Sequence, residues 1–119
     1  MTPHELSLLR DIHGAGTGIM QRTRGLTPGE YAADRDLQLT VERLFTILGE
    51  AASRLHRQYP VTAARVLELR GPIAFRNFLI HVYDQIDQGK VWDIVQTHVP
   101  PMVASVELLL REGEEEQHT

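Results

Sequence analysis

An apolar stripe between residues 35 and 58 constrains the fold more than any other feature of this sequence. Its side chains recur at steps of four, three, four, three and four residues. They are Leu37, Val41, Leu44, Leu48, Ala51 and Leu55. Because an α-helix makes one turn in about 3.6 residues, these steps place all of them on one face. The stripe therefore predicts a long helix that buries this face against other elements.

Capping signals predict where the first helices begin. Thr2-Pro3-His4-Glu5 and Thr27-Pro28-Gly29-Glu30 both have the capping-box pattern, with proline at the first helical position. Asp34 is placed to cap the helix that carries the apolar stripe. The expected ranges of these three elements are about 3–22, 28–33 and 35–58.

The second half of the chain is typical of three further helices. Tyr59-Pro60 should end the long helix, and Thr62 can cap a short helix that runs to Gly71. Pro72 and Asp87 are suitable starts for the last two helices. Their expected ranges are 72–86 and 88–112, with Pro100-Pro101 kinking or interrupting the second one. Since no segment resembles a strand, the sequence predicts an all-α antiparallel bundle of four to five helices with a kinked C-terminal helix.

Composition bounds the domain organisation and the compartment. The 119 residues suffice for one domain, over 1–112, and the acidic tail over 113–119 is expected to be disordered. The chain has no cysteine, which excludes disulfides and thiolate metal sites. No apolar run approaches the roughly 18–20 residues of a membrane span, and charges near the N-terminus argue against a signal peptide. We therefore expect a soluble cytoplasmic protein without membrane association.

The balance of charge limits the kind of nucleic-acid contact that is possible. The net charge is −4, which argues against nucleic-acid binding over the whole surface. Eleven of the twelve basic residues are arginines, and arginine binds phosphate through two parallel hydrogen bonds. A local arginine-lined phosphate site is therefore allowed.

Three glycines interrupt the first helix at Gly14, Gly16 and Gly18. Each costs a helix interior about 1 kcal/mol relative to alanine, so their presence needs a reason. A phosphate-binding glycine loop is the sharper interpretation, but no strand precedes these residues and no lysine follows them. The sequence favours the close approach of another helix, or a bent and frayed helix.

The stretch RNFLIHVYD, residues 76–84, mixes apolar side chains with chemically active ones. On a helical wheel Arg76 and Tyr83 form one polar row, and a second row lies beside it. The second row consists of Asn77, His81 and Asp84. Ile80 lies between the rows and away from the core, which suggests that this face docks on a second subunit or a partner. By spacing alone, an ordinary surface with an ion pair between Arg76 and Asp84 remains an alternative.

These residues carry a resemblance to a known family. Arginine, four residues, histidine, one residue and tyrosine follow one another from Arg76 through His81 to Tyr83. This order resembles the signature of HepT-like proteins in the HEPN superfamily. The segments LRD near the start, LTPGEYAADRD, ILGEAA in the long helix and KVWDIVQTHVPPMV after the motif are also similar to that family. The region before Arg76 lacks a tryptophan that many relatives have, which leaves the subgroup open.

The resemblance implies a helical-bundle toxin that forms a homodimer and cleaves RNA without a metal or another cofactor. Arg76 and His81 would be the catalytic pair, with Asn77 as a supporting polar residue. An MntA-type nucleotidyltransferase antitoxin would silence the toxin by adding AMP to Tyr83. The alternative is a non-catalytic HEPN module that binds a nucleotidyltransferase or a nucleotide through the same motif.

Three other polar residues are candidates for a supporting role. Glu50 is either an accessory acid near the motif or a solvated residue, and Asp84 could support the site from its own helix. Arg70 could add positive charge nearby, although an exposed arginine at a helix end needs no function. The six histidines are scattered along the chain, so we expect no metal site.

Overall fold

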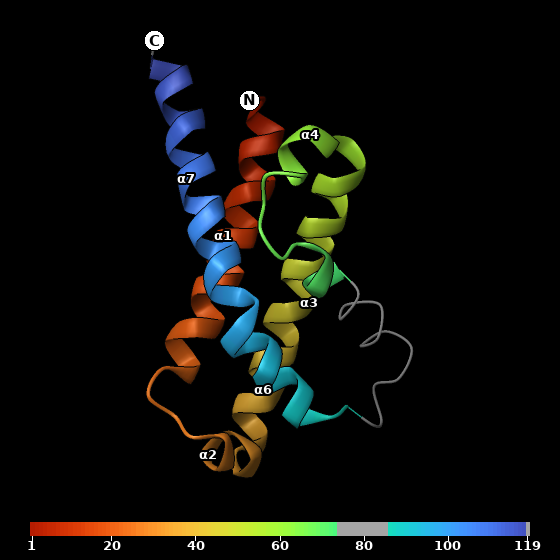
Figure 1. Cartoon of the computed structure of the whole chain (residues 1–119), viewed down its shortest axis with the longest axis vertical. Coiled ribbons are helices and arrows are strands. Elements are labelled where there is room, and N and C mark those ends of the chain that lie inside the picture. Colours follow the sequence, from red (N-terminus) through yellow and green to blue (C-terminus); the bar gives the residue numbers. More distant parts are fainter. Residues whose placement is uncertain (74–85, 119) are drawn as a thin grey trace.

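Two long helices, α1 and α3, lie side by side and carry the other elements. The computed structural model describes residues 1–73 and 86–118. In it, α1 (Pro3–Thr23) packs against both α3 (Arg35–Gln58) and α7 (Val99–His118), as Figure 1 shows. The shorter helices are α2 (Pro28–Ala33), α4 (Pro60–Ala63) and α6 (Gln88–Thr97). Among the described residues every regular element is a helix, which confirms the all-α bundle.

The expected caps start the helices. The Thr2 hydroxyl accepts from the Glu5 N–H, and the Glu5 carboxylate accepts from the Thr2 N–H, both at 3.1 Å. Thr27 and Glu30 make the same reciprocal pair at the start of α2. These bonds satisfy N–H groups that have no partner within a helix, so the start of each helix is encoded locally. The side chains of Asp34 and Asp87 cap α3 and α6 in a similar way, as the sequence predicted.

The apolar stripe of α3 faces the core, but its centre is shifted from the expected line. Leu37 and Leu44 are only partly buried, at the edge of the face. Phe45 and Ala52, which the regular stripe omits, are both 0% exposed. The buried face is therefore wider than one row of side chains, because α3 is covered by more than one neighbour. Its fully or nearly buried apolar residues are Val41, Phe45, Leu48, Ala51, Ala52 and Leu55.

Gly16 brings α1 into direct contact with α7. A Cβ atom at this position would lie 2.6 Å from Cγ2 of Val103, far inside van der Waals distance. Gly14, in contrast, has nothing within 4 Å of such an atom. This confirms that close helix approach, and not a phosphate loop, explains a glycine in α1.

The C-terminal helix is interrupted, although not at the prolines themselves. We expected one helix over 88–112 with a kink or break at Pro100-Pro101. The structure has α6 and α7 separated by His98, whose N–H still bonds to the Ile94 carbonyl at 2.9 Å. Both prolines thus lie in the first turn of α7, where the missing N–H removes no intrahelical hydrogen bond.

Residues 113–118 of the acidic tail are helical, which differs from the disorder expected over 113–119, and Thr119 lies outside the described residues. Helix α7 continues to His118, the last described residue. Gly113 is buried, and the place of its missing Cβ is taken by the side chain of Leu6 from α1. Arg65 binds both carboxylate oxygens of Glu112 at 2.8 Å. A local charge pattern does not encode these contacts with distant segments, which explains why the expectation of disorder differed from the structure.

The prediction of a short helix from Thr62 to Gly71 is wrong. Only α4 is helical there, and turns follow until a helical stretch begins at Arg70. Glu68 has a φ of 62°, a left-handed conformation that an α-helix cannot contain. The Ser105 hydroxyl on α7 accepts from the Leu67 N–H at 3.0 Å, so tertiary contacts replace the helical ones.

None of the described helices is long and apolar enough to cross a membrane.

Two glycine substitutions should have opposite effects. Gly16→Ala should lower the free energy of unfolding by about 1–3 kcal/mol, because the stiff side chain of Val103 leaves no room for a methyl group. Gly14→Ala should raise it by up to about 1 kcal/mol, because the site is open and alanine favours helix. Urea unfolding followed by circular dichroism measures both. Equal effects would contradict the contact between α1 and α7.

Glu5 should matter more for stability than Glu30, although both complete a capping box. Glu5 is 7% exposed, and its second carboxylate oxygen accepts from the Thr62 hydroxyl on α4. Glu5→Ala leaves the buried Thr62 hydroxyl without its acceptor and should cost about 1–3 kcal/mol. The exposed Glu30→Ala should cost less than about 1 kcal/mol. A larger loss for Glu30→Ala in the same urea experiment would refute this assignment.

Candidate functional site

Most of the expected site residues lie outside the described part of the chain. The segment 74–85 contains Arg76, Asn77, Ile80, His81, Tyr83 and Asp84. The structure therefore does not test whether these side chains come together. Of the supporting candidates, Glu50 and Arg70 are described. What the structure does establish is how the chain on either side of this segment is held.

The residues that border the segment are anchored in the core. Ile73 before it and Ile86 after it are both partly buried against the main apolar cluster. Pro72 is buried as well. Burial on both sides means that the segment starts and ends at defined positions, beside the 70–73 stretch and at the beginning of α6 (Figure 1).

A polar network holds the start of α6, directly after the segment. The Tyr31 hydroxyl donates to the side-chain oxygen of Gln88 at 2.9 Å, and the Gln88 amide donates to Glu42 at 3.1 Å. Arg35 completes the network through an ion pair with Glu42 at 3.3 Å. The Tyr31 ring also packs on Trp92, with ring centroids 5.4 Å apart. Helices α2, α3 and α6 are thus joined where α6 begins.

The electrostatics of this network favour a neutral tyrosine. Tyr31 is 1% exposed, and its burial, together with the nearby Glu42 carboxylate, raises the pKa of the hydroxyl above its ordinary value. The hydroxyl therefore stays protonated and keeps its role as a hydrogen-bond donor to Gln88. We interpret it as a support for the start of α6 and not as a reacting group.

A second set of contacts holds the chain directly before the segment. Nδ1 of His98 lies 2.6 Å from the Glu68 carboxylate, which ties the turn to the junction between α6 and α7. The His98 ring also lies against Gly71, 3.7 Å from the point that a Cβ atom would occupy there. Leu69 is 5% exposed and anchors the same turn in the core. The path into the segment is therefore set by contacts with the α6–α7 junction as well as by the core.

Glu50 lies on α3, on an exposed surface. It lines a small polar hollow of about 120 Å³ together with Ser53, Arg54 and Arg57. The structure brings it together with two arginines, which the sequence analysis did not anticipate. Whether it also meets the motif concerns residues outside the described part of the chain.

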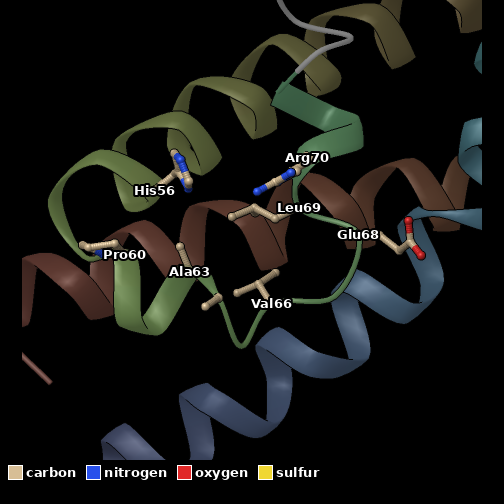
Figure 2. Close-up of a pocket in the computed structure, with 8 residues that line it drawn as sticks. His56, Pro60, Ala63, Val66, Glu68, Leu69 and Arg70 are labelled. Atoms are coloured by element: carbon tan, nitrogen blue, oxygen red, sulfur yellow. The ribbon is translucent and has the colours of Figure 1, made fainter.

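A larger pocket of about 480 Å³ lies between the end of α3 and the turn that follows α4. Figure 2 shows the side chains of His56 and Arg70 extending toward one another across it, while Glu68 extends away from both. Sequence reasoning considered Arg70 but missed His56. The two residues belong to different elements at no regular spacing, so only the fold could pair them.

The described residues contain no group of three or more histidine, aspartate or glutamate side chains able to hold a metal ion. The polar side chains that line the two hollows are three arginines, one histidine, one serine and two glutamates, with one glutamate in each hollow. Arginine and histidine side chains can bind an anion and position it.

Comparisons with known proteins identify relatives that match most of the chain. A family model described as "Ribonuclease HepT-like" matches residues 12–109, a range that includes the motif segment. The protein named "Putative RNase MJ0127" from Methanocaldococcus jannaschii is 30% identical over 112 residues, covering 92% of each chain. "Putative RNase MJ1380" from the same organism is 26% identical over 103 residues, covering 87% of this chain and 94% of its own. No solved structure matches.

The family match spans most of the chain, and the order of arginine, histidine and tyrosine from Arg76 to Tyr83 is intact within it. The chain belongs to the family of HepT-like ribonucleases.

Proposed function

We propose that this protein is a metal-independent RNA endonuclease, and that it acts as the toxin of a HEPN and nucleotidyltransferase toxin–antitoxin pair. One observation carries the proposal. The family match over residues 12–109 contains an unbroken Arg76, His81 and Tyr83 motif. The cytoplasm, where RNA and a partner antitoxin are both present, is the expected location.

The residue types suit cleavage of an RNA backbone without a metal. The 2′-hydroxyl loses its proton to a base and attacks the adjacent phosphorus, while an acid protonates the departing 5′-oxygen. An imidazole has an ordinary pKa near 6.5, so His81 can serve in either role near neutral pH. The guanidinium of Arg76 would bind the phosphate and stabilise the extra negative charge of the transition state.

A homodimer would supply both proton-transfer groups. One chain contributes only one motif histidine, whereas a two-fold axis beside Ile80 would bring two His81 and two Arg76 side chains together. One His81 would then act as the base and the other as the acid. Asn77, Asp84 and Glu50 are proposed to support these groups through hydrogen bonds.

Silencing would act on the same site. An MntA-like antitoxin would form a complex with the toxin and transfer AMP from ATP to the Tyr83 hydroxyl, which loses its proton as pyrophosphate leaves. The added phosphodiester could pair with Arg76 and occupy the position of the RNA phosphate. The adenine would block access by its size.

A non-catalytic binding module is the second candidate. The net charge of −4 favours it, because a negative protein binds free RNA weakly. In that case the same motif would bind a nucleotidyltransferase or a nucleotide without cleavage.

Substitution of His81 separates the two candidates. His81→Ala should reduce the cleavage of a fluorescent single-stranded RNA at least about 100-fold, because it removes the acid and the base together. His13→Ala, on α1, is the matched control and should retain activity. Excess EDTA should leave the wild-type rate unchanged.

Equal inertness of the wild type and His81→Ala would count against the nuclease. A requirement for added metal would contradict metal independence, and full activity of His81→Ala would contradict the catalytic role of His81. Sedimentation of the active protein as a monomer would contradict the shared site alone.

Tyr83→Phe should leave RNA cleavage intact but remove the acceptor for AMP. Co-expression with the neighbouring nucleotidyltransferase should add one or more AMP masses to the wild type and none to this variant. Mass spectrometry of the intact protein and its peptides measures the change. AMP on another residue, with Tyr83 unmodified, would defeat the proposed silencing.

A further inference from the structure

The pocket between His56 and Arg70 combines an apolar floor with a rim that carries one guanidinium and one imidazole. Ala63, Val66 and Leu69 line it, and each of these is at most 5% exposed. His56 and Arg70 are both exposed and extend toward one another over this floor (Figure 2). A volume of about 480 Å³ is within the range of sites that hold small organic ligands.

The described lining of the pocket offers no free acid to neutralise the rim. Glu68 is the only acidic residue among the described residues that line it. Its carboxylate is engaged by His98 at 2.6 Å and is directed away from the side chains of His56 and Arg70. Within residues 1–73 and 86–118, neither His56 nor Arg70 has an ion-pair partner, whereas the nearby Arg65 is paired with Glu112. The rim therefore has unused capacity to bind an anion.

Helix stability does not account for Arg70. It is the first residue of the helical stretch over 70–73. The N-terminal end of a helix carries partial positive charge, so a positive side chain there is unfavourable. His56 is different, because it lies in the last turn of α3, a common position for basic side chains. Of the two rim residues, Arg70 is thus the stronger indication of a ligand.

The pocket also lies within reach of the motif, whatever the conformation of the residues between them. Arg70 precedes Arg76 by six residues, and six residues span at most about 20 Å when fully extended. A single RNA strand crosses such a distance in a few nucleotides. An anion bound at Arg70 could therefore belong to the same strand as a phosphate bound at Arg76.

We infer that this pocket is a subsite for one nucleotide of single-stranded RNA, close to the phosphate that is cleaved. Arg70 and His56 bind the backbone phosphate of that nucleotide, and the floor of Ala63, Val66 and Leu69 packs against its base. Unstacked bases of single-stranded RNA are commonly bound in this way, with the backbone held by cations. This inference rests on the proposed RNA cleavage and adds two residues that contribute to substrate binding without acting on protons.

RNA affinity tests the subsite in a protein that cannot cut. In the full-length His81→Ala background, Arg70→Gln should weaken binding of a short fluorescent single-stranded RNA about tenfold, measured by fluorescence anisotropy. The slope of log K against log salt should become shallower by about 0.7, the value for one lost phosphate contact. Arg24→Gln is the matched control, since it removes the same charge from an exposed position at the far end of α1 and should change affinity less than about twofold.

A second variant blocks the pocket without touching a core residue. Ala64 is exposed and lines the pocket, so Ala64→Glu introduces a negative charge there at little cost to folding. It should weaken RNA binding at least as much as Arg70→Gln. Circular dichroism confirms that each variant is folded.

The outcomes separate the subsite from the proposed function. If the wild type cleaves RNA but Arg70→Gln and Ala64→Glu bind RNA as Arg24→Gln does, the subsite is refuted and the nuclease stands. If the wild type neither cleaves nor binds RNA, the proposed function itself fails. If both pocket variants lose affinity and Arg24→Gln does not, the pocket is assigned as an RNA subsite.

Discussion

The direct contact of α1 with α7 at Gly16 is the constraint on which the rest of this bundle depends. With no side chain between them, the backbone of α1 meets Val103, and α7 is held close against α1. Gly113 repeats the arrangement against Leu6 near the other end of the same pair. Glycines at two positions along the pair limit the distance between α1 and α7 more closely than the buried apolar area does. The hydrophobic effect favours burial but does not specify a direction or a distance.

This packing defines where the motif segment starts and ends. On one side, His98 and Glu68 tie the entering chain to the junction of α6 and α7. On the other side, Tyr31 and Gln88 tie the start of α6 to α2 and α3. The break at His98 contributes here, since it lets one residue contact the turn that precedes the segment.

The distribution of charge explains how an acidic protein can belong to a ribonuclease family. The net charge of −4 is distributed unevenly, with glutamates gathered at the end of α7 and cations at the end of α3. Arg65 and Glu112 form an ion pair between these two regions, and salt screens the interactions of the remaining exposed charges over about 10 Å. An anion at the proposed subsite therefore responds more to nearby charges such as Arg70 than to the net charge of the protein.

The sequence by itself determined the helical class, the starts of α1, α2, α3 and α6, and the family. These features depend on local rules: capping boxes, the period of the apolar residues and a motif of fixed spacing. Only the tertiary structure decided that the 113–118 segment is helical, that Glu68 breaks the expected helix before Arg70, and that His56 faces Arg70. Each of these depends on contacts between segments far apart in the chain, and no local pattern of residues encodes which distant partner a side chain will meet.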